Sequence, residues 1–409
     1  MKLNPKHHNW LGGKPVLRVF EALSEGQARF VGGCVRNALL GVPVSDYDIA
    51  TTLEPKAVSR ALKSAGIAVH ETGLSHGTLT AVADHEVFEI TTLRRDVSTD
   101  GRRANVAFTK DWAEDAQRRD FTINALYCDL EGNIFDPCGQ SLADIKAKRL
   151  RFVGSAKGRI KEDYLRILRY FRLQAQYFDT EIMDKEALSA CRELKTGLKK
   201  LSAERIWSEV KKLLATPAPF RTVNVMLVNG ILEILLPEAS NSEGLQLICE
   251  LEMEMGLAVD PYFRLMAMSA RDEFAMAGLC RRLKMSKKEK TRLMQWAGDQ
   301  TALKPSLPEK DLKIAIYKAG RQTAIDRALL RAAGASESMI RNEWLNIYKT
   351  ARDWDWPKFP IAGKDLIAAG IASGPKVGTV MAALEALWVR SGFNATKQAL
   401  LAALIMINR

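Results

Sequence analysis

The stretch ARFVGGCVRNALLG at residues 28–41, followed by DYDIAT at residues 46–51, decides the fold of the N-terminal part of this chain. It reads as a short apolar strand, two glycines, a helix with Arg36 in its first turn, and then a second strand entered through an Asp-x-Asp pair. Glycines permit close backbone approach, and free N–H groups at a helix start attract phosphate. The stretch predicts a unit of mixed strands and helices with an anion site, although such a turn on its own is more often a plain connection.

The Asp-x-Asp pair is a candidate metal site. Side chains alternate across a strand, so Asp46 and Asp48 face one side while Tyr47 faces the other. Two carboxylates this close raise each other's pKa unless a cation lies between them. Oxygen ligands beside a phosphate site favour Mg²⁺. A solvated turn with two acids is the alternative for an isolated Asp-x-Asp.

The order of these two pieces is more informative than either piece alone. A triphosphate on the backbone amides of the Gly32 and Gly33 turn can have two metals at its α-phosphorus, which activate an attacking hydroxyl and stabilise the leaving pyrophosphate. The sequence therefore predicts nucleotidyl transfer. Glu89 is a candidate third carboxylate from a neighbouring strand, although an exposed position on a half-buried strand is the simpler interpretation.

The composition is that of a folded, basic protein. The 409 residues include 60 Lys plus Arg against 48 Asp plus Glu, and the formal charge of +12 is expected of a protein that meets a polyanion. Aromatic residues make up only 7%, which favours phosphate contacts over base stacking. All five histidines lie at or before His85, which excludes histidine-based metal or triad chemistry from the rest of the chain.

The cysteines and the apolar runs indicate the compartment. Six cysteines are scattered with no C-x-x-C pair, so we expect reduced packing residues. No apolar run is long enough to span a bilayer, and the N-terminus lacks the apolar region of a signal peptide. We expect a cytoplasmic protein with no membrane partner.

The pattern of the chain changes near residue 160. Short β-rich runs mixed with helices occupy residues 28–152, whereas EDYLRILRYFRLQAQYF and SAERIWSEVKKLLA have helical apolar spacing. The sequence therefore predicts an α+β chain, with a sheet-containing head over residues 1–152 and an all-helical remainder. The prolines of ATPAPF place a boundary between helical parts at residues 153–216 and 217–409.

The segment RRDFTINALY carries further candidate ligand residues. Arg119 can clamp phosphates, and Asp120 and Asn124 are suited to a ribose hydroxyl. A plain helix cap is the competing explanation for Asp120.

The segment KEDYLRILRYFR predicts a helix on which Asp163 and Arg166 are surface neighbours. An intrahelical ion pair is the ordinary interpretation. In the functional one, the carboxylate accepts from the exocyclic amine of cytosine or adenine and the guanidinium donates to the ring nitrogen. Uracil and guanine present the reverse pattern and leave buried charges unpaired. Arg169 and Arg172 continue the basic stripe towards the triphosphate or the primer.

With these residues the sequence resembles the class II tRNA nucleotidyltransferases (CCA-adding enzymes) and the related bacterial poly(A) polymerases of the polymerase-β superfamily. The matching pieces are VGGCVRNALLG, DYDIAT, RRDFTINAL, FDPCGQSLADIKAKRLRFVG, EDYLRILRYFR and LSAERIWSEVKKLL, in family order. The resemblance implies a polymerase-β-like nucleotidyltransferase head followed by a helical neck, body and tail. It also implies catalytic Mg²⁺ at Asp46 and Asp48. The candidate nucleotide-binding residues are Gly32, Gly33, Arg36, Arg119, Asp120, Asn124, Asp163, Arg166, Arg169 and Arg172.

Four further features of the sequence bear on the comparison with this family. Asn37 stands where the family commonly has Asp, and residues 93–110 resemble the family's flexible loop, which is associated with the switch between C and A addition. Late in the chain, G-K-D-L before G-P-x-V-G looks like the C-terminal segment of CCA-adding enzymes, with a plain turn between helices as its alternative. The basic run RRLKMSKKEKTR at residues 281–292 is a candidate contact for the acceptor arm, with a solvated helix face as its alternative.

The sequence thus predicts a template-independent enzyme that adds or repairs the 3′ CCA of tRNA with CTP and ATP. The alternatives are a poly(A) polymerase, a partial enzyme adding only CC or only A, a non-catalytic RNA-binding protein, and a nucleotidyltransferase acting on a small molecule. The long basic helical part of the chain speaks against the last of these.

Overall fold

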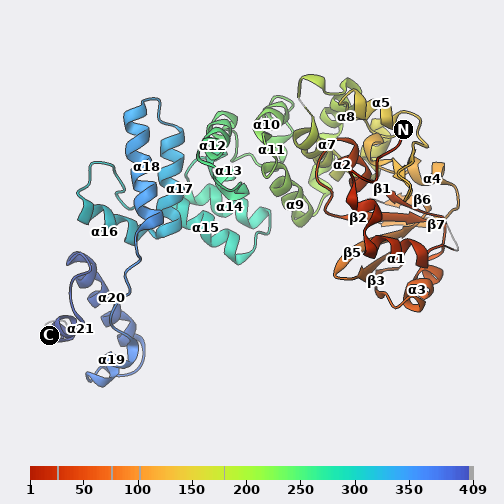
Figure 1. Cartoon of the computed structure of the whole chain (residues 1–409). Helices are drawn as coiled ribbons and strands as arrows, with labels where there is room; N and C mark the ends of the chain where they lie inside the picture. The colour runs from red at the N-terminus through yellow and green to blue at the C-terminus, as the bar shows by residue number, and fades with distance from the viewer. Residues whose placement is uncertain (25–26, 75–76, 101–102, 179, 405–409) are drawn as a thin grey trace. The chain divides into compact units, whose positions relative to one another are not determined.

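The computed structural model of the chain describes residues 1–24, 27–74, 77–100, 103–178 and 180–404. By contacts the chain divides into two compact units, Met1–Ser242 and Glu243–Arg409 (Figure 1). The first unit holds the strands, and the described residues of the second unit form helices joined by turns and loops, which confirms the predicted α+β class with a sheet-containing head before helical parts.

The head is built on one seven-stranded sheet in the order β3-β4-β5-β2-β1-β8-β9. Only β2 and β5 pair in parallel; the other pairs described in this sheet are antiparallel. The strands are β1 (Ala28–Val31), β2 (Tyr47–Thr51), β3 (Ala68–Gly73), β4 (Thr78–Ala83), β5 (Glu86–Thr92), β8 (Tyr127–Cys128) and β9 (Ile134–Phe135).

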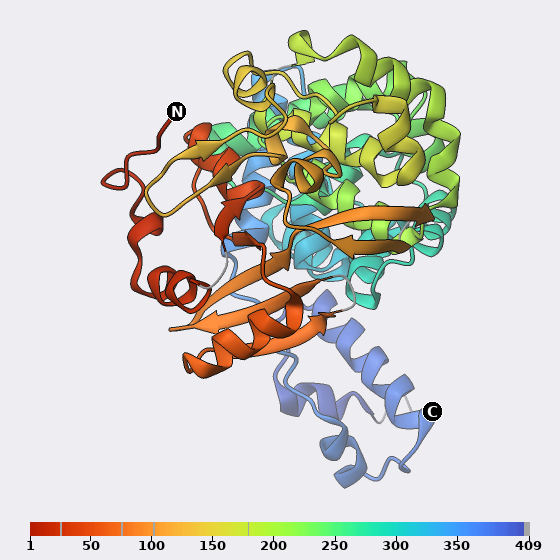
Figure 2. The ribbon, with the colours of Figure 1, turned by 90° about the vertical axis from the view of Figure 1, so that its right-hand side faces the viewer.

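Periodicity explains why these segments pack as they do. In β4 the apolar Leu79, Ala81 and Ala83 are buried and alternate with partly exposed residues, as expected of a strand covered on one face. Helix α3 (Pro55–Ser64) begins at a proline and buries Val58 and Leu62 beside β3 and β4. Figure 2 shows this helix alongside the orange strands of the head.

A second, two-stranded antiparallel sheet follows β5. Strand β6 (Arg94–Asp100) pairs with β7 (Arg103–Phe108). The segment predicted to be the flexible loop, residues 93–110, therefore contains a β-hairpin, and its residues 101–102 lie outside the described part of the chain. Helix α4 (Trp112–Gln117) contacts β6 directly.

The remaining helices of the first unit come before, between and after its strands in the sequence. Before and between the first strands lie η1 (Asn9–Gly12), α1 (Lys14–Ala22) and α2 (Gly33–Leu39). After the hairpin come η3 (Thr122–Asn124), α5 (Ser141–Lys146), α6 (Ala156–Glu162), α7 (Leu165–Tyr177), η4 (Thr180–Ile182), α8 (Lys185–Leu194), η5 (Lys195–Lys200), α9 (Ala203–Leu214), α10 (Pro219–Val228) and α11 (Leu232–Leu235).

The prediction of one continuous helix through EDYLRILRYFR was wrong. Helix α6 ends at Glu162, and Asp163 has an extended backbone with φ −153° and ψ 106°. The Asp163 carboxylate accepts a hydrogen bond from the N–H of Leu165 at 3.1 Å, which satisfies a donor at the start of α7. The side chain that was expected to lie along a helix therefore lies at a junction between two helices.

The described residues of the second unit form two hydrophobic cores. One gathers residues such as Ile316, Leu329 and Ile347, and the other gathers Leu366, Leu384 and Trp388. Its helices are α12 (Ser242–Met255), α13 (Pro261–Met268), α14 (Glu273–Arg282), α15 (Lys287–Gly298), α16 (Glu309–Ala319), α17 (Arg321–Ala333), α18 (Ser338–Asp353), α19 (Gly363–Ala368), α20 (Pro375–Arg390) and α21 (Lys397–Ala402). No helix among the described residues has the length and apolar character that crossing a membrane requires.

Candidate active site

The Gly32–Gly33 turn lies between β1 and α2, as the sequence predicts. Gly32 has φ 73°, in the left-handed region that favours glycine. A Cβ at Gly32 would lie 3.6 Å from Nη1 of Arg119 and 3.8 Å from Oδ2 of Asp48. The turn therefore brings bare backbone close to one carboxylate and one guanidinium.

Asp48 supplies the carboxylate that lies beside this turn. It lies on β2 opposite Glu89 of β5, whereas Tyr47 stacks on Phe88 with ring centroids 5.4 Å apart. Because side chains alternate, Asp48 and Glu89 share the face of the sheet opposite to the aromatic pair. Burial, the charge of Glu89 and the charge of Asp46 raise the pKa of Asp48 to about 6, although Arg119 opposes them.

These acids fit a divalent cation. Asp46 is exposed just before β2 and is close enough to act on the pKa of Asp48. Crowded carboxylates with a raised pKa are what a bound cation relieves. The described residues hold no cluster of three or more His, Cys, Asp or Glu arranged around a metal position. Two carboxylates suffice, however, where substrate phosphates complete the shell.

Arg36 is buried beside the turn and is held by neutral acceptors. Its Nη1 donates to Oδ1 of Asn124 at 2.5 Å, its Nη2 to Oη of Tyr177 at 2.7 Å, and both Nε and Nη2 to Oδ1 of Asn37 at 3.1 and 2.8 Å. The guanidinium also lies over the Tyr177 ring, 4.4 Å from its centroid. Burial lowers the pKa of Arg36. An anion that binds Arg36 would therefore have to replace these neutral partners or share the guanidinium with them.

Asn124 and Asp120 form a bridge between two arginines. Asn124 donates through Nδ2 to Oδ1 of Asp120 at 3.0 Å, while its own oxygen accepts from Arg36. Asp120 accepts from Nε of Arg169 at 2.7 Å, and Arg169 and Asn124 hold the pKa of Asp120 down at about 2 despite burial. Asp120 precedes η3, whose N-cap is Phe121, so its carboxylate acts in this bridge and not as the cap of that helix.

Arg119 is fixed by Asp115, a residue that the sequence patterns did not single out. Nη2 and Nε of Arg119 donate to Oδ2 of Asp115 at 2.9 and 3.2 Å, and the Tyr127 hydroxyl donates to the same oxygen at 2.7 Å. Two arginines hold the pKa of Asp115 well below its usual range. The i,i+3 and i,i+4 spacing of Asp115 to Arg118 and Arg119 was a readable helical signal.

The two residues predicted to read the base each have a different ion-pair partner. Asp163 accepts from Nη2 of Arg205 at 2.6 Å, and Arg166 donates through Nη1 to Oε2 of Glu162 at 2.5 Å. The expected simple ion pair between Asp163 and Arg166 is thus replaced by two separate pairs. Arg205 comes from α9, so only packing of α7 on α9 reveals it.

Arg172 completes the set on α7. Its Nε donates to Oε2 of Glu209 on α9 at 2.6 Å, and its charge lowers the pKa of Arg36. Arg172 and Arg36 are therefore electrostatic neighbours. The structure brings Gly32, Gly33, Arg36, Asp46, Asp48, Arg119, Asp120, Asn124, Arg169 and Arg172 into one linked network, with Asp163 and Arg166 at its α6–α7 junction.

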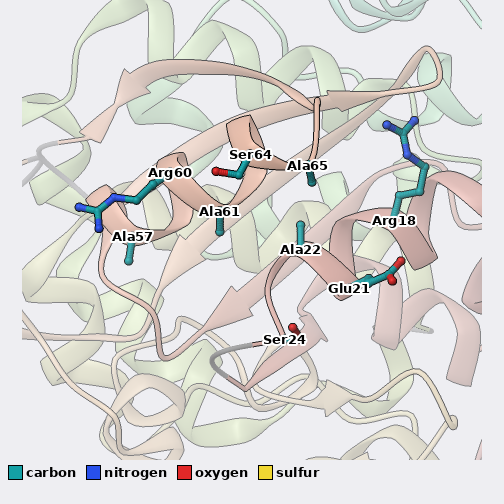
Figure 3. Close-up of a pocket in the computed structure, with 9 residues that line it drawn as sticks. All are labelled: Arg18, Glu21, Ala22, Ser24, Ala57, Arg60, Ala61, Ser64 and Ala65. Carbon is teal, nitrogen blue, oxygen red and sulfur yellow. The ribbon is translucent and has the colours of Figure 1, made fainter.

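A separate hollow of about 520 Å³ lies elsewhere on the head, between α1 and α3. Figure 3 shows its lining, where alanines from α1 and α3 lie between Arg60 at one end and Arg18 and Glu21 at the other. Arg18 is already paired with Asp84 at 2.7 Å. None of the residues predicted for catalysis lines this hollow, so the predicted nucleotide site lies outside it.

Comparisons with known proteins show which family the chain belongs to. Residues 28–151 match the family described as Poly A polymerase head domain, and residues 182–242 match the one described as Probable RNA and SrmB-binding site of polymerase A. The chain is 36% identical to CCA tRNA nucleotidyltransferase 1, mitochondrial, of Mus musculus over 95% of this chain and 89% of that protein. It is 32% identical to the CCA-adding enzyme of Lactococcus lactis subsp. lactis over 98% of each chain.

Solved structures share the fold along the whole chain. The crystal structure of the Bacillus stearothermophilus CCA-adding enzyme in complex with CTP has a TM-score of 0.69 and 26% identity, covering 100% of this chain and 98% of that one. The Thermotoga maritima CCA-adding enzyme complexed with tRNA-CCA has a TM-score of 0.63 at 19% identity, covering 100% of this chain and 97% of that one. The second likeness supports the fold alone.

The fold and the comparisons together define a nucleotidyltransferase, and in its head the Asp48 carboxylate stands beside a glycine turn. The chain belongs to the CCA tRNA nucleotidyltransferase family, also called the CCA-adding enzymes. The nucleotidyltransferases of this family need divalent metal ions. The predicted family, fold and enzyme class are confirmed.

Proposed function

We propose that this chain completes or repairs the 3′ CCA end of tRNA with CTP and ATP, without a nucleic-acid template, and releases pyrophosphate. The observation that carries the proposal is the meeting of Asp48 and Arg119 within 4 Å of the Cβ position of Gly32. A bare turn, a carboxylate and a cation at one point suit a metal-bound triphosphate. Likeness to CCA-adding enzymes over the whole length favours this activity over poly(A) synthesis.

Asp46 and Asp48 hold the divalent cation in this proposal, and we assign it as Mg²⁺ because the donors are hard carboxylate oxygens. When bound, the cation supplies Lewis-acid activation of the RNA 3′-hydroxyl and of the α-phosphorus. Gly32 and Gly33 let the triphosphate approach the backbone. Arg119 and Arg36 bind its negative charge, and the bridge of Asn124 and Asp120 orients Arg36 and Arg169. The ribose contact predicted for Asp120 and Asn124 stays a prediction.

Asp163 and Arg166 select the base. The hydrogen bonds that Arg166 makes to described residues use only its Nη1, so its Nε and Nη2 can donate to a ring nitrogen. The Asp163 carboxylate accepts from Arg205 and from the N–H of Leu165, and its remaining lone pairs can accept from an exocyclic amine. Cytosine and adenine fit this pattern. Uracil and guanine would instead place a carbonyl acceptor against the Asp163 carboxylate and a ring N–H donor against the Arg166 guanidinium.

The parts of the chain divide the work in this proposal. We assign catalysis to residues 1–152, base recognition to the neck at residues 153–216, and tRNA binding to the body and tail at residues 217–409. Arg172 belongs to the neck, and its positive charge lowers the pKa of Arg36. A cytoplasmic location stays a prediction, because the relatives include both mitochondrial and bacterial proteins.

The test is extension of a tRNA transcript that lacks CCA. The purified chain is incubated with CTP alone, ATP alone or both, with Mg²⁺ or with chelator, and the products are separated at single-nucleotide resolution. We expect two additions with CTP, a complete CCA with both, and none with chelator. Long tails from ATP alone would identify a poly(A) polymerase, and products ending at CC or requiring preformed CC would identify a partial enzyme.

A matched variant separates catalysis from RNA binding. Asp48→Asn keeps the shape of the side chain but removes the charge that binds metal. We expect extension to fall by about 1,000-fold or more, as for loss of a metal-held transition state, while tRNA affinity is retained. If the double variant Asp46→Asn, Asp48→Asn extends tRNA at the wild-type rate, these carboxylates do not hold the catalytic metal.

A further inference from the structure

We propose that Asp115 is a positioning residue that sets the orientation of Arg119 and couples it to the base of the β6–β7 hairpin. The inference rests on the proposed function, since Arg119 matters here as a contact of the incoming nucleotide. Asp115 accepts hydrogen bonds from Arg94, Arg118, Arg119 and Tyr127, so we expect its effect to pass through the Arg119 side chain.

One oxygen of Asp115 fixes a single edge of the Arg119 guanidinium. Oδ2 accepts from Nη2 and Nε of Arg119, and the Tyr127 hydroxyl, which donates to Oδ2 at 2.7 Å, also accepts from Nε at 3.2 Å. The opposite corner of the guanidinium, Nη1, lies 3.6 Å from the Cβ position of Gly32. The carboxylate thereby aims Nη1 at the turn where the triphosphate is proposed to bind.

The other oxygen of Asp115 holds the start of the hairpin. Oδ1 accepts from the backbone N–H of Arg94, the first residue of β6, at 3.2 Å. The hairpin base is closed next to it, because Thr109 donates its N–H to the carbonyl of Leu93 at 2.9 Å. A displacement of the hairpin base relative to α4 must therefore stretch a bond to the same carboxylate that orients Arg119.

Burial and charge make this coupling stiff. The Asp115 side chain is only 1% exposed, and Oδ1 also accepts from Nε and Nη2 of Arg118 at 2.9 and 2.7 Å. An asparagine at this position can accept on only one side and would turn its NH₂ against donors on the other.

The test is a double-mutant cycle between Asp115→Asn and Arg119→Ala, with extension of tRNA by CTP and ATP as the readout. We expect Asp115→Asn to raise KM for both nucleotides by about tenfold, the scale of losing one charged hydrogen bond, with kcat changed by less than about threefold. In the Arg119→Ala background the same substitution should change KM by less than about twofold, because the residue it positions is gone. Equal effects in both backgrounds would overturn the inference and leave Asp115 a structural residue.

Arg118→Ala is the matched control, since it removes a cation from Oδ1 and leaves the Oδ2 contacts to Arg119 in place. We expect its KM to stay within about threefold of the wild type. If Asp115→Asn fails to fold, Tyr127→Phe removes only the hydroxyl shared by Asp115 and Arg119. That variant should raise KM in the same direction and lose its effect in the Arg119→Ala background; no rise in KM would contradict the inference.

Amide hydrogen exchange tests the hairpin half of the inference. In Asp115→Ala, which removes both carboxylate oxygens, the Arg94 amide should exchange about tenfold faster or more, while the Leu93 amide, which donates to the carbonyl of Thr51, keeps its wild-type rate. Unchanged protection of Arg94 would refute the coupling to the hairpin. If Arg119→Ala itself leaves KM unchanged, the proposed nucleotide contact fails; if only Asp115→Asn is silent, this inference alone fails.

Discussion

Asp48 lies directly opposite Glu89 in the parallel pairing of β2 with β5. The two carboxylates come from segments that are far apart in the sequence and share one face of the sheet. Burial and the charge of Glu89 raise the pKa of Asp48 to about 6, and Arg119 and Arg36 limit the rise. A proton and a divalent cation therefore compete for the Asp48 carboxylate near neutral pH.

The first prediction is a pH-dependent metal affinity with a matching loss of stability in the metal-free protein. The pKa of Asp48 is raised in the folded state, so its stabilising contribution is present below the unfolded value of 3.8 and is lost as the pH rises through about 6. Metal affinity should rise over the same range and level off above it. Thermal unfolding in chelator and metal titration, both followed from acid to neutral pH, measure the two effects.

Glu89→Gln distinguishes a third metal ligand from a neighbouring charge. If Glu89 acts only through its charge, the variant moves both pH midpoints downward and leaves metal affinity at pH 8 unchanged. If it is a ligand, affinity at pH 8 falls as well. Glu86→Gln, on the same strand but on the face of Phe88, is the control and should move neither midpoint. Midpoints that do not respond to Glu89→Gln would refute the assigned cause of the raised pKa.

The second prediction concerns Asn37, where the family commonly has Asp. The acceptors that the described residues offer to Arg36 are the neutral groups of Asn37, Asn124 and Tyr177. Asn37→Asp gives the buried guanidinium a carboxylate, so we expect the free energy of unfolding to rise by about 1 kcal/mol. Because the positive charge is then partly satisfied, KM for the nucleotides should rise by about threefold with kcat retained.

Chemical denaturation and steady-state kinetics check both halves of that prediction. Asn37→Ala is the matched variant, because it removes the acceptor without adding charge; it should lower stability. An unchanged or lower KM in Asn37→Asp would mean that the charge of Arg36 does not contribute to triphosphate binding.

The parts of the site that the sequence predicts are those coded by neighbouring residues. Gly32 adopts a positive φ between a strand and a helix, and Asp48 faces away from Tyr47 because side chains alternate along β2. Both conclusions need only local geometry. Asp115 was also readable from its helical spacing to two arginines, but the same spacing occurs on exposed helices where it has little consequence.

The partners that the sequence does not reveal are those brought in by tertiary packing. Arg205 and Glu209 lie on α9 and meet Asp163 and Arg172 only because α7 packs against that helix. The break at Asp163 is equally hidden, since apolar residues continue at helical spacing on both sides of it. Periodicity reports which face is buried and does not report where one helix ends and the next begins.

The third prediction is that Arg205 maintains base selection by holding Asp163. Arg205→Gln leaves Asp163 without its ion-pair partner at 2.6 Å, so the carboxylate can turn away from the position of the exocyclic amine. We expect misincorporation of UTP or GTP relative to CTP to rise by about tenfold, equivalent to one charged hydrogen bond. Lys157→Gln, which removes the exposed pair with Glu193, is the control and should not change selectivity. Selectivity that survives in Arg205→Gln would mean that α9 does not orient the base-reading residue.

The last prediction separates two kinds of cation in the basic run at residues 281–292. Arg292 donates to Asp260 at 2.5 Å and to both oxygens of the buried Asp326 at 2.8 and 3.0 Å, whereas Lys287 and Lys288 are exposed at the start of α15. Arg292→Gln leaves a buried carboxylate without its cation, so it should destabilise the second unit by about 3 kcal/mol. Its effect on tRNA binding, measured on the folded variant, should be small.

The double variant Lys287→Gln, Lys288→Gln should show the opposite pattern, with unchanged stability and weaker tRNA binding. If these lysines bind RNA phosphates, the double variant keeps its unfolding temperature but binds tRNA more weakly, and the slope of log affinity against log salt decreases by about 1 for each phosphate that is no longer neutralised. Filter binding over a range of salt concentrations and thermal unfolding of the same preparations measure both quantities. A wild-type salt slope would show that this run is a solvated helix face and that other cations of the second unit meet the tRNA.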